Sequence, residues 1–335
     1  MNVAMWLRAL QIIPRITPAE WHRLDLVSRW LIASRGAVLV ITFISAGIAG
    51  LLALRDGGFD LVIWALVTAG LLLAHATNNL LNDFTDHVKG VDRDNYFRAQ
   101  YGPHPLEHGL MGRRELLTYA AGTGLVALLI GAYLVATRGP LTLPLLAAGA
   151  FFVLFYTYPL KYIGLGEIAV LIVWGPLMIA GAYYVITGRV DGNVALAGLP
   201  YALGATTVIF GKHIDKVKDD RAKGIHTLPV IVGERLARAV VVAMFLLQYA
   251  LVAYLVVVGF FTPVMLVVLL AAPKLRDALA IYRAPKPESR PDAYPADTWP
   301  LYYVAYAFGH NRRYGLLFLV GLVTDVVVRG LLRVF

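Results

Sequence analysis

Long apolar segments constrain this chain more than any other feature, because they recur from residue 31 to near its end. A helix needs roughly 20 apolar residues to cross the hydrocarbon core of a membrane. The chain is 59% hydrophobic and 15% charged, whereas about 25% of the residues of a soluble domain are charged. We therefore predict an all-α, polytopic membrane bundle of about nine transmembrane helices, at residues 31–54, 60–81, 115–137, 141–158, 167–187, 193–211, 237–258, 261–282 and 299–327.

Residues 1–30 differ from the rest of the chain, because large apolar side chains are mixed there with arginines. This pattern predicts an amphipathic segment that lies in the membrane interface and is broken at Pro14 and Pro18. No small-residue cleavage site follows an apolar core in residues 1–20, which argues against a cleaved signal peptide. We predict a single transmembrane domain at 31–335. The chain has no cysteine, which excludes disulfides and thiolate metal sites.

Basic residues set the expected orientation. With the N-terminus in the cytoplasm, 23 of the 30 Lys and Arg residues lie in cytoplasmic segments or at the cytoplasmic ends of the predicted spans, as the positive-inside rule expects. The net charge of +9 is spread over loops, which favours contact with an anionic leaflet over binding of nucleic acid. The other seven are Arg55, Arg138, Arg189, Arg329 and Arg333 outside, and Arg312 and Arg313 within the last predicted span. His310 also lies in that span, and no role is assigned to it.

An acidic cluster closes the second predicted span. Asn82, Asp83 and Asp86 are spaced i, i+1 and i+4, so they project from one side of a helix. Carboxylates at a membrane helix end are costly unless they have a partner. Mg²⁺ takes carboxylates, an amide oxygen and water, and commonly shares its shell with phosphate. This cluster therefore predicts a divalent cation site at the cytoplasmic face.

A second acidic cluster closes the sixth predicted span. Asp215 and Asp219 lie one helical turn apart and are candidates to share a metal, with Asp220 beside them. On the same helical face, Lys212 and Lys216 are candidates to meet phosphate oxygens. A salt-bridged helix end is the alternative interpretation of this spacing. Two such clusters facing each other would hold a diphosphate between metal ions.

Several motifs resemble those of the UbiA superfamily of intramembrane prenyltransferases. Its first aspartate-rich motif is similar to Asn82-Asp83-x-x-Asp86-x-x-Lys89-Gly90-x-Asp92. Residues 156–167 and 220–230 resemble the branch that prenylates 1,4-dihydroxy-2-naphthoate in menaquinone synthesis. The resemblance covers roughly residues 30–327.

The resemblance implies a bundle around a central cavity, in which two Mg²⁺ ions bind the diphosphate of a prenyl donor. It implies an enzyme that transfers the isoprenyl group to a small aromatic acceptor. The expected location is the plasma membrane of a prokaryote, with the active site on the cytoplasmic side. By position, Asn82, Asp86 and Asp92 match first-motif ligands with Asp83 beside them, and Asp220 matches the later aspartate of the second motif.

The second motif departs from the family pattern. That branch usually has Asn-Asn-x-Arg-Asp before the later aspartate, with the earlier aspartate four residues ahead of it. Here Lys216 occupies that position, Asp215 is displaced by one residue, and Lys212 and His213 replace the asparagines. Either Asp215 and Asp219 form the working pair, or a local helix irregularity realigns Asp215 with Asp220.

The candidate residues fall into three groups. The predicted metal ligands are Asn82, Asp83, Asp86, Asp92, Asp215, Asp219 and Asp220. The residues predicted to act in catalysis are Asp86, Asp92, Lys212, Asp219 and Asp220. Those predicted to bind the substrates are Lys89, Arg93, Arg98, Tyr158, Lys161, Tyr162, His213 and Lys216. His87, His213 or Tyr162 is a candidate to ionise the hydroxyl of the acceptor.

Other functions stay open at this point. The same fold would suit a hydroxybenzoate or glycerol phosphate acceptor, or cyclisation of the donor. An ion-coupled transporter is a further alternative, although its carboxylates would be expected near the membrane midplane. The sequence leaves the donor chain length and the oligomeric state undetermined.

Overall fold

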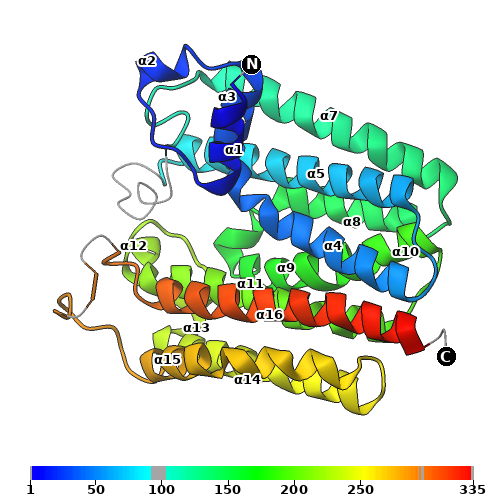
Figure 1. Cartoon of the computed structure of the whole chain (residues 1–335). Helices are drawn as coiled ribbons and strands as arrows, with labels where there is room; N and C mark the ends of the chain where they lie inside the picture. The colour runs from blue at the N-terminus through cyan, green and yellow to red at the C-terminus, as the bar shows by residue number, and fades with distance from the viewer. Residues whose placement is uncertain (1, 92–102, 293, 296–297, 333–335) are drawn as a thin grey trace. The chain divides into compact units, whose positions relative to one another are not determined.

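The computed structural model describes residues 2–91, 103–292, 294–295 and 298–332, and within these ranges it contains helices and turns but no strand (Figure 1). The chain divides into two compact units. The N-terminal unit comprises Met1–Ala46 and Val62–Pro159, and the C-terminal unit comprises Gly47–Leu61 and Leu160–Phe335. Each unit is described by itself.

Three short helices open the N-terminal unit, and side chains cap each of them. The Asn2 side chain accepts from the amide of Met5, Thr17 and Glu20 form a reciprocal capping box, and Asp25 accepts from the amide of Ser28. Pro18 is the first residue of the second helix, a position where its missing N–H has no cost. The helices are α1 (Val3–Gln11), α2 (Pro18–Trp21) and α3 (Leu26–Ala33).

The core of the N-terminal unit joins these short helices to longer ones. Trp21 and Ile32 are buried in one cluster with Leu80 of α5 and Leu116 of α7. The outer face of α1 keeps apolar side chains exposed, and its place in the membrane interface stays a prediction. The remaining elements of this unit are η1 (Gly36–Val38), α4 (Val40–Arg55, which continues into the other unit), α5 (Leu61–Val88), α7 (Arg113–Thr137) and α8 (Thr142–Phe155).

Helix α11 (Gly192–Asp215) is the centre of the C-terminal unit, where it packs against α9, η3, α14 and α16. Glycines allow this close packing. A Cβ atom on Gly211 would lie 2.9 Å from the backbone of Val304, and one on Gly204 would clash with the Asn311 side chain. The other elements are η2 (Leu160–Ile163), α9 (Gly166–Ile172), the π-helix η3 (Val173–Ala180), α10 (Gly181–Thr187), α12 (Val217–Ala222), α13 (Leu228–Val232), α14 (Glu234–Val257), η4 (Pro263–Ala271), α15 (Ala272–Tyr282) and α16 (Tyr303–Leu332).

All nine predicted spans overlap helical segments, but seven rather than nine meet the length and hydropathy expected of a membrane-crossing helix in the described residues. Helix α8 has 14 residues, or about 21 Å, against a hydrocarbon core of about 30 Å. The eighth predicted span is divided into the 3₁₀ segment η4 and the more polar helix α15. These two segments account for the difference in number.

Candidate functional site

The first acidic cluster lies on the last two turns of α5, and its members differ in surroundings. Asp83 is fully buried and forms an ion pair with Arg35. Arg35 is held there by a left-handed backbone, with φ of 59°, at the start of η1. The Nε2 atom of His104 lies 4.0 Å from the Asp83 carboxylate. The Asp83 carboxylate is thus already engaged by Arg35, and its predicted role as a metal ligand stays a prediction.

Asn82 and Asp86 are related by one helical turn. The amide nitrogen of Asn82 donates to the Thr157 hydroxyl at 3.2 Å, whereas a metal would take the amide oxygen. Asp86 is 6% exposed. Helix α5 ends just beyond it, at Val88. Gly90 follows with a φ of 69°, which suits a left-handed cap, and the Val91 amide donates to the Asp86 carbonyl. The glycine of the first motif thus ends the helix that carries both candidate ligands.

The substrate-binding candidates of the first motif are only partly described. The Lys89 ammonium lies 3.8 Å from the centre of the Tyr158 ring, so these two residues are brought together. In the C-terminal unit, the Lys161 ammonium lies 5.6 Å from the centre of the Tyr162 ring. Three further candidates lie outside the described residues, namely Asp92, Arg93 and Arg98.

His87 is engaged by residues that sequence reasoning did not connect to it. Its Nδ1 atom lies 2.5 Å from the Glu107 carboxylate, and Arg113 lies 3.2 Å from its Nε2 atom. Within the same loop, the Nδ1 atom of His104 accepts from the amides of Leu106 and Glu107. These contacts fasten residues 103–113 to the end of α5 and make His87 a weaker candidate for a base.

The second acidic cluster lies at a break between two helices. Helix α11 ends at Asp215, Lys216 has φ of −108° and ψ of 6°, and α12 begins at Val217. An irregularity of this kind was one of the two predicted alternatives. It does not bring Asp215 beside Asp220, because Asp215 turns toward another helix.

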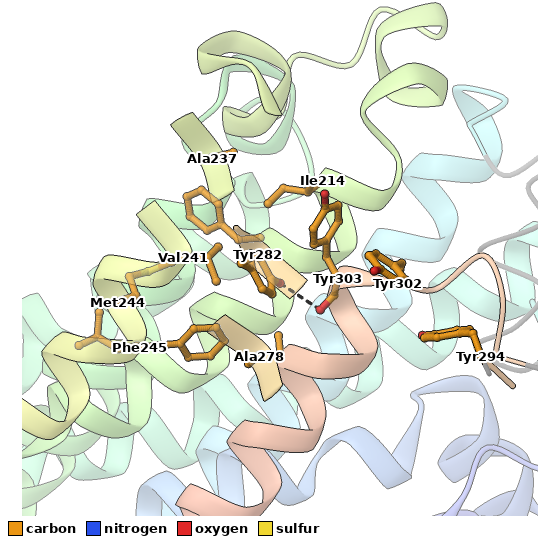
Figure 2. Close-up of a cluster of buried hydrophobic side chains, with 13 residues drawn as sticks. Ile214, Ala237, Val241, Met244, Phe245, Ala278, Tyr282, Tyr294, Tyr302 and Tyr303 are labelled. Atoms are coloured by element: carbon orange, nitrogen blue, oxygen red, sulfur yellow. Dashed lines mark hydrogen bonds between the residues drawn. The ribbon is translucent and has the colours of Figure 1, made fainter. Parts of the chain in front are cut away.

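Asp215 caps the N-terminus of α16. Its carboxylate accepts from the backbone amides of Tyr302, Tyr303 and Val304 at 2.9, 3.1 and 3.1 Å. The Lys286 ammonium lies 3.6 Å away, and the Asp215 side chain is fully buried. Figure 2 shows Ile214, the residue before Asp215, among the tyrosines at the start of α16, where the Tyr282 hydroxyl donates to the Tyr303 carbonyl at 3.0 Å. These contacts differ from the metal role predicted for Asp215.

Asp220 has the surroundings expected of a metal ligand. It is 2% exposed, and its Oδ1 atom lies 3.2 Å from the Lys216 ammonium. Its Oδ2 atom is buried and has no hydrogen-bond partner within the part of the chain that the structure describes. A buried carboxylate oxygen without a partner is costly. Asp219, the next residue on α12, is exposed.

His213, a residue of the second motif, forms a buried pair with Glu167, which lies 46 residues earlier in the sequence. His213 Nδ1 is 2.6 Å from the Glu167 carboxylate, whose other oxygen accepts from the amide of Leu228 at 3.3 Å. Lys212 precedes His213 on α11 and is half-buried. Sequence reasoning missed Glu167 as a partner of His213, although a glutamate at the start of an apolar span was a usable signal.

Each acidic motif contributes candidate oxygen ligands within its own unit. No group of three or more His, Asp or Glu side chains arranged for a metal occurs within the described ranges. Asn82 and Asp86 in one unit, and Asp219 and Asp220 in the other, offer the hard oxygen donors that Mg²⁺ prefers. The orphaned oxygen of Asp220 fits such an ion.

Known proteins resemble the chain in sequence and fold. The model of the UbiA prenyltransferase family matches residues 40–311. The 1,4-dihydroxy-2-naphthoate octaprenyltransferase of Escherichia coli is 31% identical over 220 residues, which are 62% of this chain and 70% of that enzyme.

Two solved structures share the fold. A UbiA homologue from Aeropyrum pernix has a TM-score of 0.64 at 19% identity, covering 85% of this chain and 97% of its own. A homologue from Archaeoglobus fulgidus bound to GPP and Mg²⁺ has a TM-score of 0.51 at 18% identity, covering 85% of this chain and 98% of its own. With seven apolar helices of membrane-crossing length in the described residues and a family match over most of its length, the chain is an integral membrane protein and belongs to the UbiA family of prenyltransferases.

Proposed function

We propose that this prenyltransferase moves an isoprenyl group from a prenyl diphosphate to an aromatic acceptor of the naphthoate type and releases diphosphate. The similarity to the Escherichia coli octaprenyltransferase supports the acceptor class. Membership of a prenyltransferase family sets aside the transporter alternative. We further propose that the reaction depends on two bound Mg²⁺ ions. We also propose that it takes place at the cytoplasmic face of a prokaryotic plasma membrane.

The buried, unsatisfied Oδ2 atom of Asp220 carries the metal part of this proposal. We propose that Asp219 and Asp220 in the second motif, and Asn82, Asp86 and Asp92 in the first, hold Mg²⁺ and through it the diphosphate. Bound Mg²⁺ supplies positive charge that stabilises the departing diphosphate. Asp83 and Asp215 are left out of the ligand set, because Arg35 and the start of α16 occupy their carboxylates.

Basic side chains are proposed to bind the remaining diphosphate oxygens. Lys216 is held at 3.2 Å from Asp220, so it lies beside the proposed metal ligand. Lys212, Lys89, Arg93 and Arg98 are proposed to contribute in the same way, as point charges or bidentate donors.

The acceptor is proposed to contact residues that are aromatic or oriented by a partner. Tyr158, Tyr162 and Lys161 are proposed to contact the substrates, and an aromatic face stabilises positive charge on an allylic carbon. Glu167 fixes the ring of His213 through Nδ1, which leaves Nε2 as the atom that can accept a hydrogen bond from an acceptor hydroxyl.

The test follows a labelled prenyl diphosphate in the purified protein with Mg²⁺ or with a chelator. We expect a prenylated product with 1,4-dihydroxy-2-naphthoate, only when Mg²⁺ is present. Hydroxybenzoate, glycerol phosphate and no acceptor are the comparison arms. Product with one of these alone would replace the proposed acceptor, and equal turnover in the chelator would overturn the metal role.

A further inference from the structure

A pocket of about 540 Å³ opens at one end of the C-terminal unit, and the proposed function does not use it. Gly192, the first residue of α11, lines this pocket, whereas Asp215 ends the same helix at the second motif. A helix of 24 residues separates them by roughly 35 Å. The pocket therefore lies at the opposite membrane face from the second motif. Its charged lining residues are Arg55, Asp56, Arg189, Asp191 and Arg329.

Arg55 and Asp56 form a rigid, neutral wall of this pocket. The Arg55 guanidinium bonds both carboxylate oxygens of Asp56, at 2.8 and 3.1 Å, and donates to the Phe260 carbonyl at 3.0 Å. It also lies over the Phe260 ring, 4.1 Å from its centre. The Tyr183 hydroxyl donates to Asp56 at 2.9 Å. Because this carboxylate is already engaged, it competes little for the other cations.

Two further guanidiniums bond chiefly to backbone carbonyls. Arg189 is exposed and donates to the Asp56 carbonyl at 3.1 Å, and Arg329 donates to the carbonyls of Gly259 and Phe260 at 2.7 and 2.8 Å. The Nε atom of Arg329 also lies 3.5 Å from the Asp325 carboxylate. A guanidinium has five N–H donors, and the bonds made among the described residues use only some of them. The five charged residues of the lining have a formal charge of +1, and the fully buried carboxylate of Asp325 balances the charge of Arg329 from behind the lining.

The three arginines of the pocket favour a negatively charged ligand at the membrane surface. Three of the five cations expected outside gather in this pocket, against the tendency of basic residues to lie in the cytoplasm. Val190 lines the pocket and is 77% exposed, and Val257, two residues before Gly259 of the lining, is 84% exposed. Guanidiniums beside exposed apolar side chains suit a phosphate that carries acyl chains.

We propose that this pocket binds the headgroup of a phospholipid with one net negative charge. The phosphodiester would be held by Arg189 and Arg329, and the acyl chains would run past Val190 and Val257. A zwitterionic lipid suits the pocket less well, because its own cation would lie close to the exposed guanidinium of Arg189. This proposal is independent of the reaction at the acidic motifs.

The test counts lipids on the purified full-length protein by native mass spectrometry, with phosphatidylglycerol or phosphatidylcholine at equal concentration. We expect one retained phosphatidylglycerol and at least tenfold weaker retention of phosphatidylcholine. The Arg189→Gln variant should bind phosphatidylglycerol about tenfold more weakly, the effect of one charge-assisted hydrogen bond, and Arg189→Gln with Arg329→Gln more weakly still. Arg138→Gln removes the same charge from another exterior loop and should leave retention unchanged.

Arg189 makes one bond to a loop carbonyl among the described residues, so its substitution should leave folding and prenyl transfer intact. Equal retention of phosphatidylglycerol by wild type and both variants would overturn the proposal. So would an equal loss in Arg138→Gln, which would indicate a general effect of charge. A third arm adds inorganic phosphate at the same concentration as the lipid. Retention of phosphate by wild type, together with loss of the bound phosphatidylglycerol, would assign the site to a free anion and overturn the lipid assignment.

Discussion

Replacing Asp215 tests whether this residue holds a helix or a metal. Its carboxylate accepts three backbone amides of α16 and pairs with Lys286. Burial lowers the pKa of Lys286 and the Asp215 charge opposes that shift, so removing the charge leaves the buried ammonium less stable. Breaking a buried pair in this way costs roughly 3–5 kcal/mol, which includes the loss of the helix cap.

The expected size of the effect can be measured without metal. For Asp215→Ala in a chelator, a loss of about 3–5 kcal/mol lowers the melting temperature by roughly 6–10 °C, at about 2 °C per kcal/mol for a large chain. Asp215→Asn keeps one acceptor oxygen and should lose about half as much. The assay is thermal unfolding of the purified protein in one detergent.

Asp220→Asn is the matched control. It removes a charge from the same motif, but from a carboxylate that has one buried oxygen without a partner in the described residues. We expect its metal-free melting temperature to fall by less than that of Asp215→Ala. If Asp215→Ala melted like wild type in the chelator and lost only its response to Mg²⁺, the capping role would be refuted.

Three other predictions concern the two units separately. Asp86→Ala should abolish product formation while the protein still folds, since it removes a proposed ligand; normal turnover would contradict that role. Arg35→Met should cost roughly 3–5 kcal/mol because it strands buried Asp83, and Arg35→Met with Asp83→Leu should recover part of this in thermal unfolding; no recovery would refute the pairing. Glu167→Gln should lower kcat about 10²-fold with the KM for prenyl diphosphate unchanged, and a change in KM alone would refute the orienting role of Glu167.

Features that depend on neighbouring residues could be predicted from the sequence. Hydropathy located the long spans, because burial in lipid imposes apolar length on each helix independently. A helix irregularity near Lys216 was one of two predicted alternatives, and the structure has a break there, although it does not align Asp215 with Asp220.

Features that depend on distant partners could not be predicted. Asp215 and Tyr302 are 87 residues apart, Arg35 and Asp83 are 48 apart, and Glu167 and His213 are 46 apart. Spacing in the sequence shows that each carboxylate needs a partner but does not identify it. For Asp215 and Asp83 the described partners are a helix end and an arginine, and for this reason we propose a smaller ligand set than the one predicted from the sequence.

The central claim is that Asp86 and Asp220 bind a prenyl diphosphate through Mg²⁺. The most direct measurement is equilibrium binding of a prenyl thiodiphosphate, which resists ionisation, to wild type, Asp86→Asn and Asp220→Asn, with Mg²⁺ and with a chelator. We predict tight binding by wild type only with Mg²⁺, and a loss of at least tenfold in each variant. Equal affinity with and without Mg²⁺, or undiminished affinity in both variants, would contradict the claim.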